Sequence, residues 1–202
     1  MVGKPKVGDR EKYLAKDWFE ELRDIICTSF EKIELSQDSG PFSKYGPGKF
    51  ERKKTTRQGK NGEDGGGGVM SIMRNGRVFE KVGVNVSTVH GELDPLAQKS
   101  LSSRHDIPGL KTDPRFWASG ISLVAHMQSP KTPAVHMNTR MFWTSEMTWF
   151  GGGSDLNPMV ENSKDTEFAG MYLETLSFSL SFPLSTSCIT ATPVTGLVIE
   201  YI

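Results

Sequence analysis

The sequence has no excess of charge, no closely spaced cysteine pair and no long apolar run, and each absence excludes a class of protein. Its 24 Lys and Arg residues balance 24 Asp and Glu residues, so the whole chain has no net attraction for nucleic acid or for an anionic membrane. Cys27 and Cys188 lack the spacing of a zinc motif or a disulfide framework, although a single bridge between them stays open. So few cysteines fit a reducing compartment.

No segment has the uninterrupted apolar length of a membrane-spanning helix. Residues 1–12 mix basic and acidic side chains without an apolar stretch, unlike a secretory signal or a transit peptide. The expectation from composition is therefore a soluble, cytoplasmic protein that does not insert into a membrane.

The spacing of apolar residues predicts a helix followed by strands. In residues 11–33 it predicts an amphipathic helix with one buried stripe, made of Trp18, Leu22, Ile25, Ile26 and Phe30. Residues 69–73 and 77–89 predict strands, and Asn75-Gly76 between them predicts a hairpin with a two-residue turn. A second helix is expected from residue 163, with Phe168, Met171, Tyr172 and Leu176 at its spacing.

Two polar segments near these strands receive structural rather than functional interpretations. The basic run between residues 49 and 60 contains one aromatic residue, Phe50, so it is interpreted as a solvated strand or loop and not as a nucleic-acid site. The four glycines at 65–68 lack the lysine and Ser/Thr of a phosphate-binding loop and follow two acidic residues. They are expected to form a turn or to let the backbone pass close to another segment.

The region between residues 116 and 142 carries a candidate site. Residues 120–126 and 135–142 predict two strands, and the prolines at 130 and 133 predict an antiparallel pair joined by a loop. Strand alternation puts every second side chain on one face. If the register aligns these faces, one surface displays a polar group that is costly to bury without a polar partner. Its members are Ser122, His126, His136, Asn138 and Arg140.

A glycine-rich stretch at residues 151–158 allows two interpretations. It is either a tight turn in which Asp155 accepts hydrogen bonds from nearby backbone N–H groups, or part of a functional site. The residue pattern alone does not decide between the turn and the functional site.

Four motifs together resemble the oxygen-dependent coproporphyrinogen oxidase family. The glycines at 65–68 and VFEKVGVNVS at 78–87 resemble the family's GGGG…VFEKAGVNVS, and GISLVAH at 120–126 resembles GVSLVxH. HMNTR at 136–140 resembles HxNxR, and WFGGGSDLNP at 149–158 resembles WFGGGxDLTP. The motifs occur in family order with family-like spacing, and the resemblance covers about residues 13–168.

The resemblance implies an α+β fold, with an antiparallel β-sheet flanked by helices, and a homodimer. It implies the conversion of coproporphyrinogen III to protoporphyrinogen IX in haem and porphyrin biosynthesis. In this reaction molecular oxygen is the co-substrate, and two propionates become vinyl groups with loss of carbon dioxide. Family members generally need no organic cofactor, so none is expected here.

The resemblance also implies roles for individual residues. Arg140 matches the arginine that holds a substrate propionate, and a guanidinium suits this role because it binds a carboxylate through two parallel hydrogen bonds. Asp155 matches the carboxylate that gathers the pyrrole N–H groups, and His136 matches the proposed proton donor. The implied catalytic residues are thus His136, Asp155 and Arg140. The implied substrate-binding residues are Ser122, Asn138, Thr139, Arg140 and Asp155.

His126 matches a position described as a metal ligand in bacterial members of the family. The family's next histidine would fall in residues 165–170, where this sequence has none, and two histidines on adjacent strands do not complete a catalytic metal site. We therefore expect a hydrogen-bonded or substrate-facing His126 and no required metal. A divalent metal at His126 is the alternative.

After about residue 170 the resemblance ends. Residues 177–202 are rich in Ser and Thr and contain one charged residue, Glu200. The sequence therefore predicts one partial coproporphyrinogen oxidase domain over residues 1–202, in which 171–202 is unlike the family. A sheet without its partner strands has exposed edges, so this chain alone is expected to fold poorly and to turn over substrate weakly or not at all. A non-catalytic tetrapyrrole-binding protein or an inactive truncated copy stays open as an alternative function.

Overall fold

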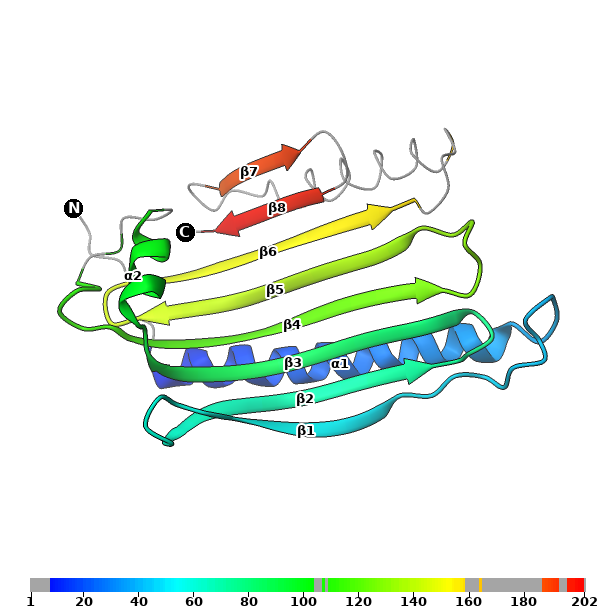
Figure 1. The fold of residues 1–202 in the computed structure, drawn as a ribbon, viewed down its shortest axis with the longest axis horizontal. Helices are drawn as coiled ribbons and strands as arrows, with labels where there is room; N and C mark the ends of the chain where they lie inside the picture. The colour runs from blue at the N-terminus through cyan, green and yellow to red at the C-terminus, as the bar shows by residue number, and fades with distance from the viewer. Residues whose placement is uncertain are drawn as a thin grey trace.

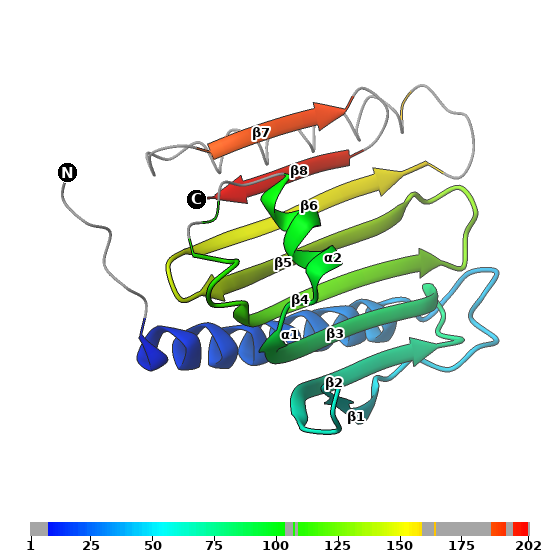
Figure 2. The same ribbon diagram turned by 60° about the vertical axis from the view of Figure 1, so that its left-hand side comes forward.

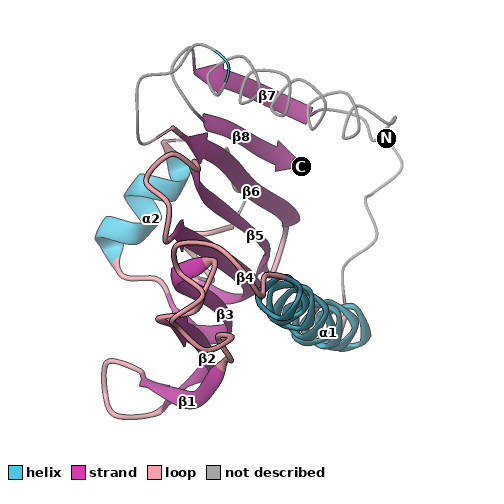
Figure 3. Ribbon diagram, turned by 90° about the vertical axis from the view of Figure 1, so that its right-hand side faces the viewer, coloured by secondary structure: helices cyan, strands magenta, loops and turns pink. Residues whose placement is uncertain are grey.

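A computed structural model describes residues 8–103, 107, 109–158, 164, 187–192 and 196–201. Within these residues one antiparallel sheet carries a long helix on one face and a short helix on the other (Figures 1 and 3). The elements are α1 (Asp9–Ser36), β1 (Glu51–Gln58), β2 (Asp64–Arg74), β3 (Phe79–Glu92), α2 (Pro95–Ser102), β4 (Arg115–Met127), β5 (Ala134–Thr144), β6 (Thr148–Asn157), β7 (Ser187–Thr192) and β8 (Gly196–Tyr201). The strand order is β1-β2-β3-β4-β5-β6-β8-β7. The expected α+β class, an antiparallel sheet flanked by helices, is confirmed.

Helix α1 contacts strands β3 and β4, and its sheet-facing side is only partly the one predicted. Three of the five expected residues pack against the core: Leu22, Ile26 and Phe30. Trp18 and Ile25 are instead 51% and 49% exposed. Phe19 is fully buried in their place, because the helix turns the side centred on Phe19 toward the sheet and leaves its flanks in solvent.

The main hydrophobic core lies between α1 and the sheet. Its strand residues alternate along each strand: Val82, Val84, Val86, Ile121, Leu123 and Ala125, joined by Met141 of β5. Since successive side chains of a strand point to opposite faces, the intervening residues face away from α1. The two strands predicted at 120–126 and 135–142 are confirmed, as is their antiparallel pairing through a loop.

The predicted hairpin between β2 and β3 is confirmed, but its loop is longer than two residues. Asn75 adopts a positive φ of 55°, as the turn residue of such a loop often does. The N–H groups of Asn75 and Gly76 donate to the carbonyls of Glu80 and Phe79, each at 2.9 Å. Residues 75–78 connect β2, which ends at Arg74, to β3, which begins at Phe79.

A buried carboxylate explains the longer loop. Glu34, near the end of α1, is 0% exposed and accepts hydrogen bonds from the backbone N–H groups of Arg77, Val78 and Phe79 at 2.6, 3.0 and 2.8 Å. It also accepts one from Gly48 at 3.0 Å. These backbone groups bond to Glu34 and are therefore not available for a tight two-residue turn. The carboxylate thus ties α1 to the hairpin that introduces β3.

The glycines at 65–68 lie inside β2, so the interpretation as a turn is wrong, whereas the expected close passage of the backbone is confirmed. A Cβ atom on Gly68 would lie 2.0 Å from the carbonyl oxygen of Val86, and one on Gly67 would lie 2.2 Å from that of Thr55. Neighbouring β1 carries most of the basic run and is exposed along nearly all its length. The interpretation as a solvated strand is confirmed.

Strands β7 and β8 extend the sheet beyond β6 (Figure 2). β8 pairs with β6, and β7 is the last strand on this side of the sheet. The helix predicted from residue 163 lies outside the described residues, apart from Lys164. In the part of the chain that the structure describes, no helix has the length and apolar character needed to cross a membrane.

Candidate active site

The strand register places four of the five predicted polar residues together on the sheet face opposite α1; His126 lies beyond the last residue pair of β4 and β5. Ser122 of β4 lies beside Asn138 of β5, and Gly120 lies beside Arg140. His136 lies beside Val124 one step further along the same strands. The condition on which the predicted site depended, an aligned register, is therefore met.

His136 pairs with Asp155 across strands β5 and β6. The His136 Nδ1 atom lies 2.9 Å from Asp155 Oδ2, and Asp155 Oδ1 accepts a hydrogen bond from the side chain of Asn157 at 2.7 Å. The side chains of His136 and Asp155 are 40% and 24% exposed. A carboxylate on Nδ1 orients the imidazole and leaves Nε2 to exchange a proton with a ligand. Asp155 lies within β6, so the interpretation of this stretch as a tight turn is wrong.

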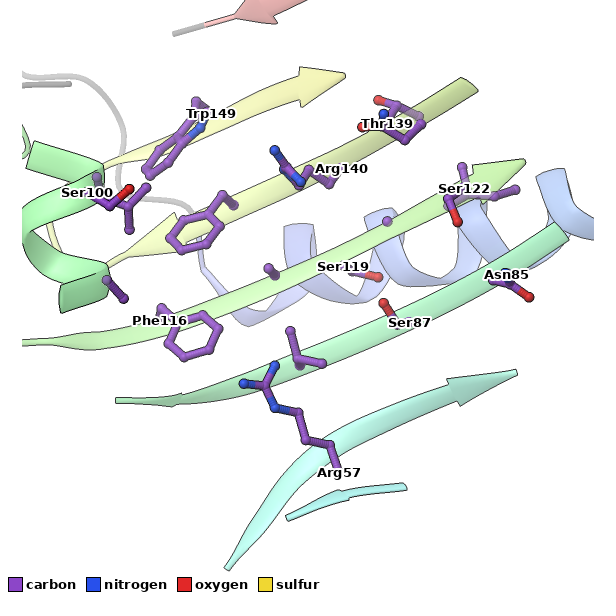
Figure 4. Close-up of a pocket in the computed structure, with 18 of the residues that line it drawn as sticks. Arg57, Asn85, Ser87, Ser100, Phe116, Ser119, Ser122, Thr139, Arg140 and Trp149 are labelled. Carbon is purple, nitrogen blue, oxygen red and sulfur yellow. The ribbon is translucent and has the colours of Figure 1, made fainter. Parts of the chain in front are cut away.

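A cavity of about 800 Å³ lies on this face, bordered by α2 (Figure 4). Its polar lining residues come from four strands and one helix: Arg57, Asn85, Ser87, Ser122, His136, Asn138, Arg140 and Ser100 among them. Its volume falls within the range of small-molecule sites, about 300–1,000 Å³.

Aromatic rings form one end of this cavity, near α2. Phe116 and Phe142 stack with their ring centroids 5.7 Å apart, and Phe142 and Trp149 stack at 4.7 Å. Beside them Gly120 has no side chain, and a Cβ atom there would lie 2.6 Å from the Cβ of Arg140. The cavity therefore combines an aromatic end with a polar end, which suits a large ligand that has both apolar rings and charged groups.

Most of the predicted site residues line the cavity: Ser122, His136, Asn138, Thr139 and Arg140. Strand alternation, however, directs the Thr139 side chain toward the α1 face, since Thr139 pairs with buried Ile121. Asp155 belongs to the site through its hydrogen bond to His136. His126 is exposed near the end of β4 and is not among the lining residues.

Three lining residues for which the sequence indicated no site role are Asn85, Ser87 and Arg57. Asn85 lies beside Ser122, and its buried Oδ1 atom has no hydrogen-bond donor among the described residues. Such an atom is costly to leave unpaired, so it is suited to accept a hydrogen bond from a ligand. A signal was present in the sequence: Asn85 and Ser87 alternate with the buried valines of β3 and so must face the other side.

The described residues do not supply a metal site. Across 8–103, 107, 109–158 and 164, no three His, Cys, Asp or Glu side chains come together as ligands would. The segment at 165–170, where the family's next histidine would fall, lies outside the described residues. These residues do not fit the metal that the resemblance associates with His126, and we derive no step through one.

The protein is of the α+β class, and the cavity on its sheet carries a histidine–carboxylate pair, an exposed arginine and an aromatic end, a set of side chains suited to ligand binding and proton transfer. A family profile described as Coproporphyrinogen III oxidase matches residues 14–176. The chain belongs to the coproporphyrinogen III oxidase family, as the four motifs implied.

The matched relatives are oxygen-dependent coproporphyrinogen-III oxidases. That of Rickettsia felis is 48% identical over 157 residues, which cover 77% of this chain and 50% of the relative. That of Rickettsia bellii is 47% identical over 160 residues, which cover 79% of this chain and 52% of the relative. The chain therefore spans about half the length of the curated relatives it matches.

Proposed function

We propose that this chain binds coproporphyrinogen III and carries out its oxygen-dependent oxidative decarboxylation to protoporphyrinogen IX. The proposal rests on one observation above all, the grouping of Arg140 with the His136–Asp155 pair on one face of the sheet beside the cavity. The substrate has four carboxylates on its rim and four pyrrole N–H donors at its centre. A guanidinium and a carboxylate are the side chains that complement these two kinds of group.

In this proposal the residues bind the macrocycle and move protons. Arg140 is exposed and has no ion-pair partner among the described residues, so its guanidinium is free to bind a propionate bidentately. Asp155 accepts hydrogen bonds from pyrrole N–H groups, and Ser122 and Asn138 supply further hydrogen bonds. His136 exchanges a proton with the substrate while Asp155 holds the orientation of its ring.

The redox chemistry then requires little of the protein. Each of two propionates loses carbon dioxide, a proton and two electrons to become a vinyl group. Oxygen accepts the four electrons in total, takes up four protons and leaves as water. The electron-rich pyrrole reacts with oxygen directly, so we propose that neither an organic cofactor nor a metal is required.

The first test compares product formation with and without oxygen. Purified protein is incubated with coproporphyrinogen III under anaerobic and then aerobic conditions, and the vinyl products are followed by chromatography. We expect product that appears only with oxygen. Product formed equally well without oxygen would contradict the proposal.

A second candidate is a tetrapyrrole-binding protein without turnover. It is favoured by one observation, that the family profile matches residues 14–176 and leaves residues 177–202 unmatched. In this candidate the same cavity and the same Arg140 hold the macrocycle, and no reaction follows. Tight binding with no oxygen-dependent product in the assay above would support this candidate over the enzyme.

We also propose that the protein works as a homodimer in the cytoplasm. Apolar side chains at Leu14, Trp18 and Ile25 lie on one side of α1 and are exposed in the single chain, which supports an association surface there. Light scattering after size-exclusion chromatography is expected to give a mass twice that of one chain, which is 22.4 kDa. Trp18→Glu is expected to lower the measured mass to that of one chain. A single-chain mass before the substitution would contradict the dimer.

A further inference from the structure

Arg57 lines the same cavity as Arg140, but it lies on the edge strand β1, four strands away from β5. It lies in β1, and Figure 4 shows its side chain extending from that strand toward the cavity, whereas Arg140 lies on β5. Arg57 lies two residues after Thr55, which pairs with Gly68 of β2, and Gly68 pairs with the cavity-lining Ser87 of β3. Because side chains alternate along a strand, Arg57 shares the cavity face with Thr55.

The strand between Arg57 and the cavity has no side chain in the way. On β2, Gly66 pairs with Val89 and Gly68 pairs with Ser87, and both of these β3 residues line the cavity. The two glycines therefore face the same side of the sheet as the cavity. Their missing side chains leave a passage across which Arg57 reaches the ligand.

Neither arginine of the cavity has an ion-pair partner among the described residues, unlike Arg23, Arg52 and Arg115. Arg23 and Arg52 bond to Asp24, each within 2.9 Å, and Arg115 bonds to Asp113 at 2.7 Å. Both guanidinium groups can therefore bind carboxylates of a ligand without first breaking an ion pair within the described residues.

The spacing of the two arginines suits a wide ligand. β1 and β5 are separated by three strands, so their backbones lie about 19 Å apart at the usual strand spacing. A ligand that contacts both guanidinium groups must therefore be wide, as is a macrocycle with carboxylates on its rim. A small dicarboxylate would not reach both groups.

We propose that Arg57 binds a second carboxylate of the ligand, on the side of the macrocycle opposite to the one held by Arg140. The inference rests on the proposed tetrapyrrole function and adds a specificity residue to it. Two arginines on opposite sides favour a tetrapyrrole with carboxylates all around its rim. A tetrapyrrole whose two carboxylates lie on neighbouring rings can engage one arginine side only.

The test compares two stable porphyrins that differ in their carboxylates. Coproporphyrin III carries four propionates, and mesoporphyrin IX carries two on neighbouring rings with ethyl groups in place of the others. Binding to the full chain is followed by fluorescence titration for the unsubstituted protein and for Arg57→Ala, Arg57→Lys and Lys54→Ala. Lys54 is the matched control, because it removes the same charge from the same strand but lines a hollow on the α1 side.

We expect Arg57→Ala to raise the Kd for coproporphyrin III about tenfold and the Kd for mesoporphyrin IX less than about twofold. Arg57→Lys keeps the charge but loses the bidentate contact. Its Kd for coproporphyrin III is therefore expected to lie between that of the unsubstituted protein and that of Arg57→Ala. Lys54→Ala is expected to bind both porphyrins as the unsubstituted chain does. Circular dichroism spectra of all variants are expected to coincide, since Arg57 is exposed.

Four results would overturn the inference, and only the last of them would also overturn the proposed function. An unchanged Kd of Arg57→Ala for coproporphyrin III means that Arg57 binds no carboxylate, while the proposed function survives. If Arg57→Ala loses affinity equally for both porphyrins, or if Lys54→Ala loses as much affinity as Arg57→Ala, the loss is a general effect of charge or structure. Absence of binding to the unsubstituted chain overturns the proposed function together with the inference.

Discussion

Replacing Asp155 with asparagine is expected to lower oxygen-dependent product formation at least about 100-fold, the lower end of what general acid–base catalysis contributes. Asp155 orients the His136 ring through a 2.9 Å hydrogen bond to Nδ1, and its carboxylate is the group proposed to gather pyrrole N–H donors. An asparagine amide retains the shape but has one acceptor oxygen in place of two and no charge. Chromatography of the vinyl products measures the loss.

A double substitution tests whether His136 and Asp155 act together. If they form one unit, His136→Gln combined with Asp155→Asn is expected to reduce the rate little further than the more harmful single change. Asp17→Asn is the matched control, because Asp17 is an exposed carboxylate of α1 far from the cavity lining. Independent, multiplying losses in the double variant would contradict the paired role that we assign to these two residues.

Replacing Glu34 with leucine is expected to lower the free energy of unfolding by about 4 kcal/mol or more. Leucine leaves four backbone N–H groups without their acceptor, those of Gly48, Arg77, Val78 and Phe79. Such a loss is a large share of the about 5–15 kcal/mol that stabilises an ordinary domain. Urea denaturation followed by circular dichroism measures it, with a lower midpoint expected.

Two further variants separate the role of Glu34 from a general effect of changing α1. Glu34→Gln keeps one acceptor oxygen and is expected to lose about half as much stability as Glu34→Leu. Glu31→Leu removes a carboxylate that accepts a single backbone N–H, that of Phe50 at 2.9 Å, and is expected to cost about 1 kcal/mol. Equal losses for Glu31→Leu and Glu34→Leu would show that the four hydrogen bonds are not what stabilises the hairpin.

Local patterns in the sequence were sufficient for much of the fold. The strands at 120–126 and 135–142 and the faces of Ser122, Asn138 and Arg140 within them follow from an alternation of period two, and the proline-containing loop indicated that the two strands pair. The turn residues Asn75-Gly76 marked the hairpin correctly. The motifs identified the family, which the comparisons confirmed.

Predictions failed where a distant segment changed the local outcome. The loop after Asn75 is longer than a two-residue turn because Glu34, more than 40 residues earlier, binds its N–H groups. The glycines at 65–68 form a strand because β1 and β3 approach them on both sides. Trp18 and Ile25 are exposed because the sheet contacts only one side of α1.

The sequence by itself determined which residues of each strand share a face, because side chains alternate along any extended chain. It did not determine which strands lie side by side, since strand order depends on contacts between residues far apart in the chain. Only the tertiary structure brought Asp155 of β6 to His136 of β5 and turned Arg57 of β1 toward the cavity of Arg140. Pairing of distant strands, and not local pattern, therefore decided the composition of the site.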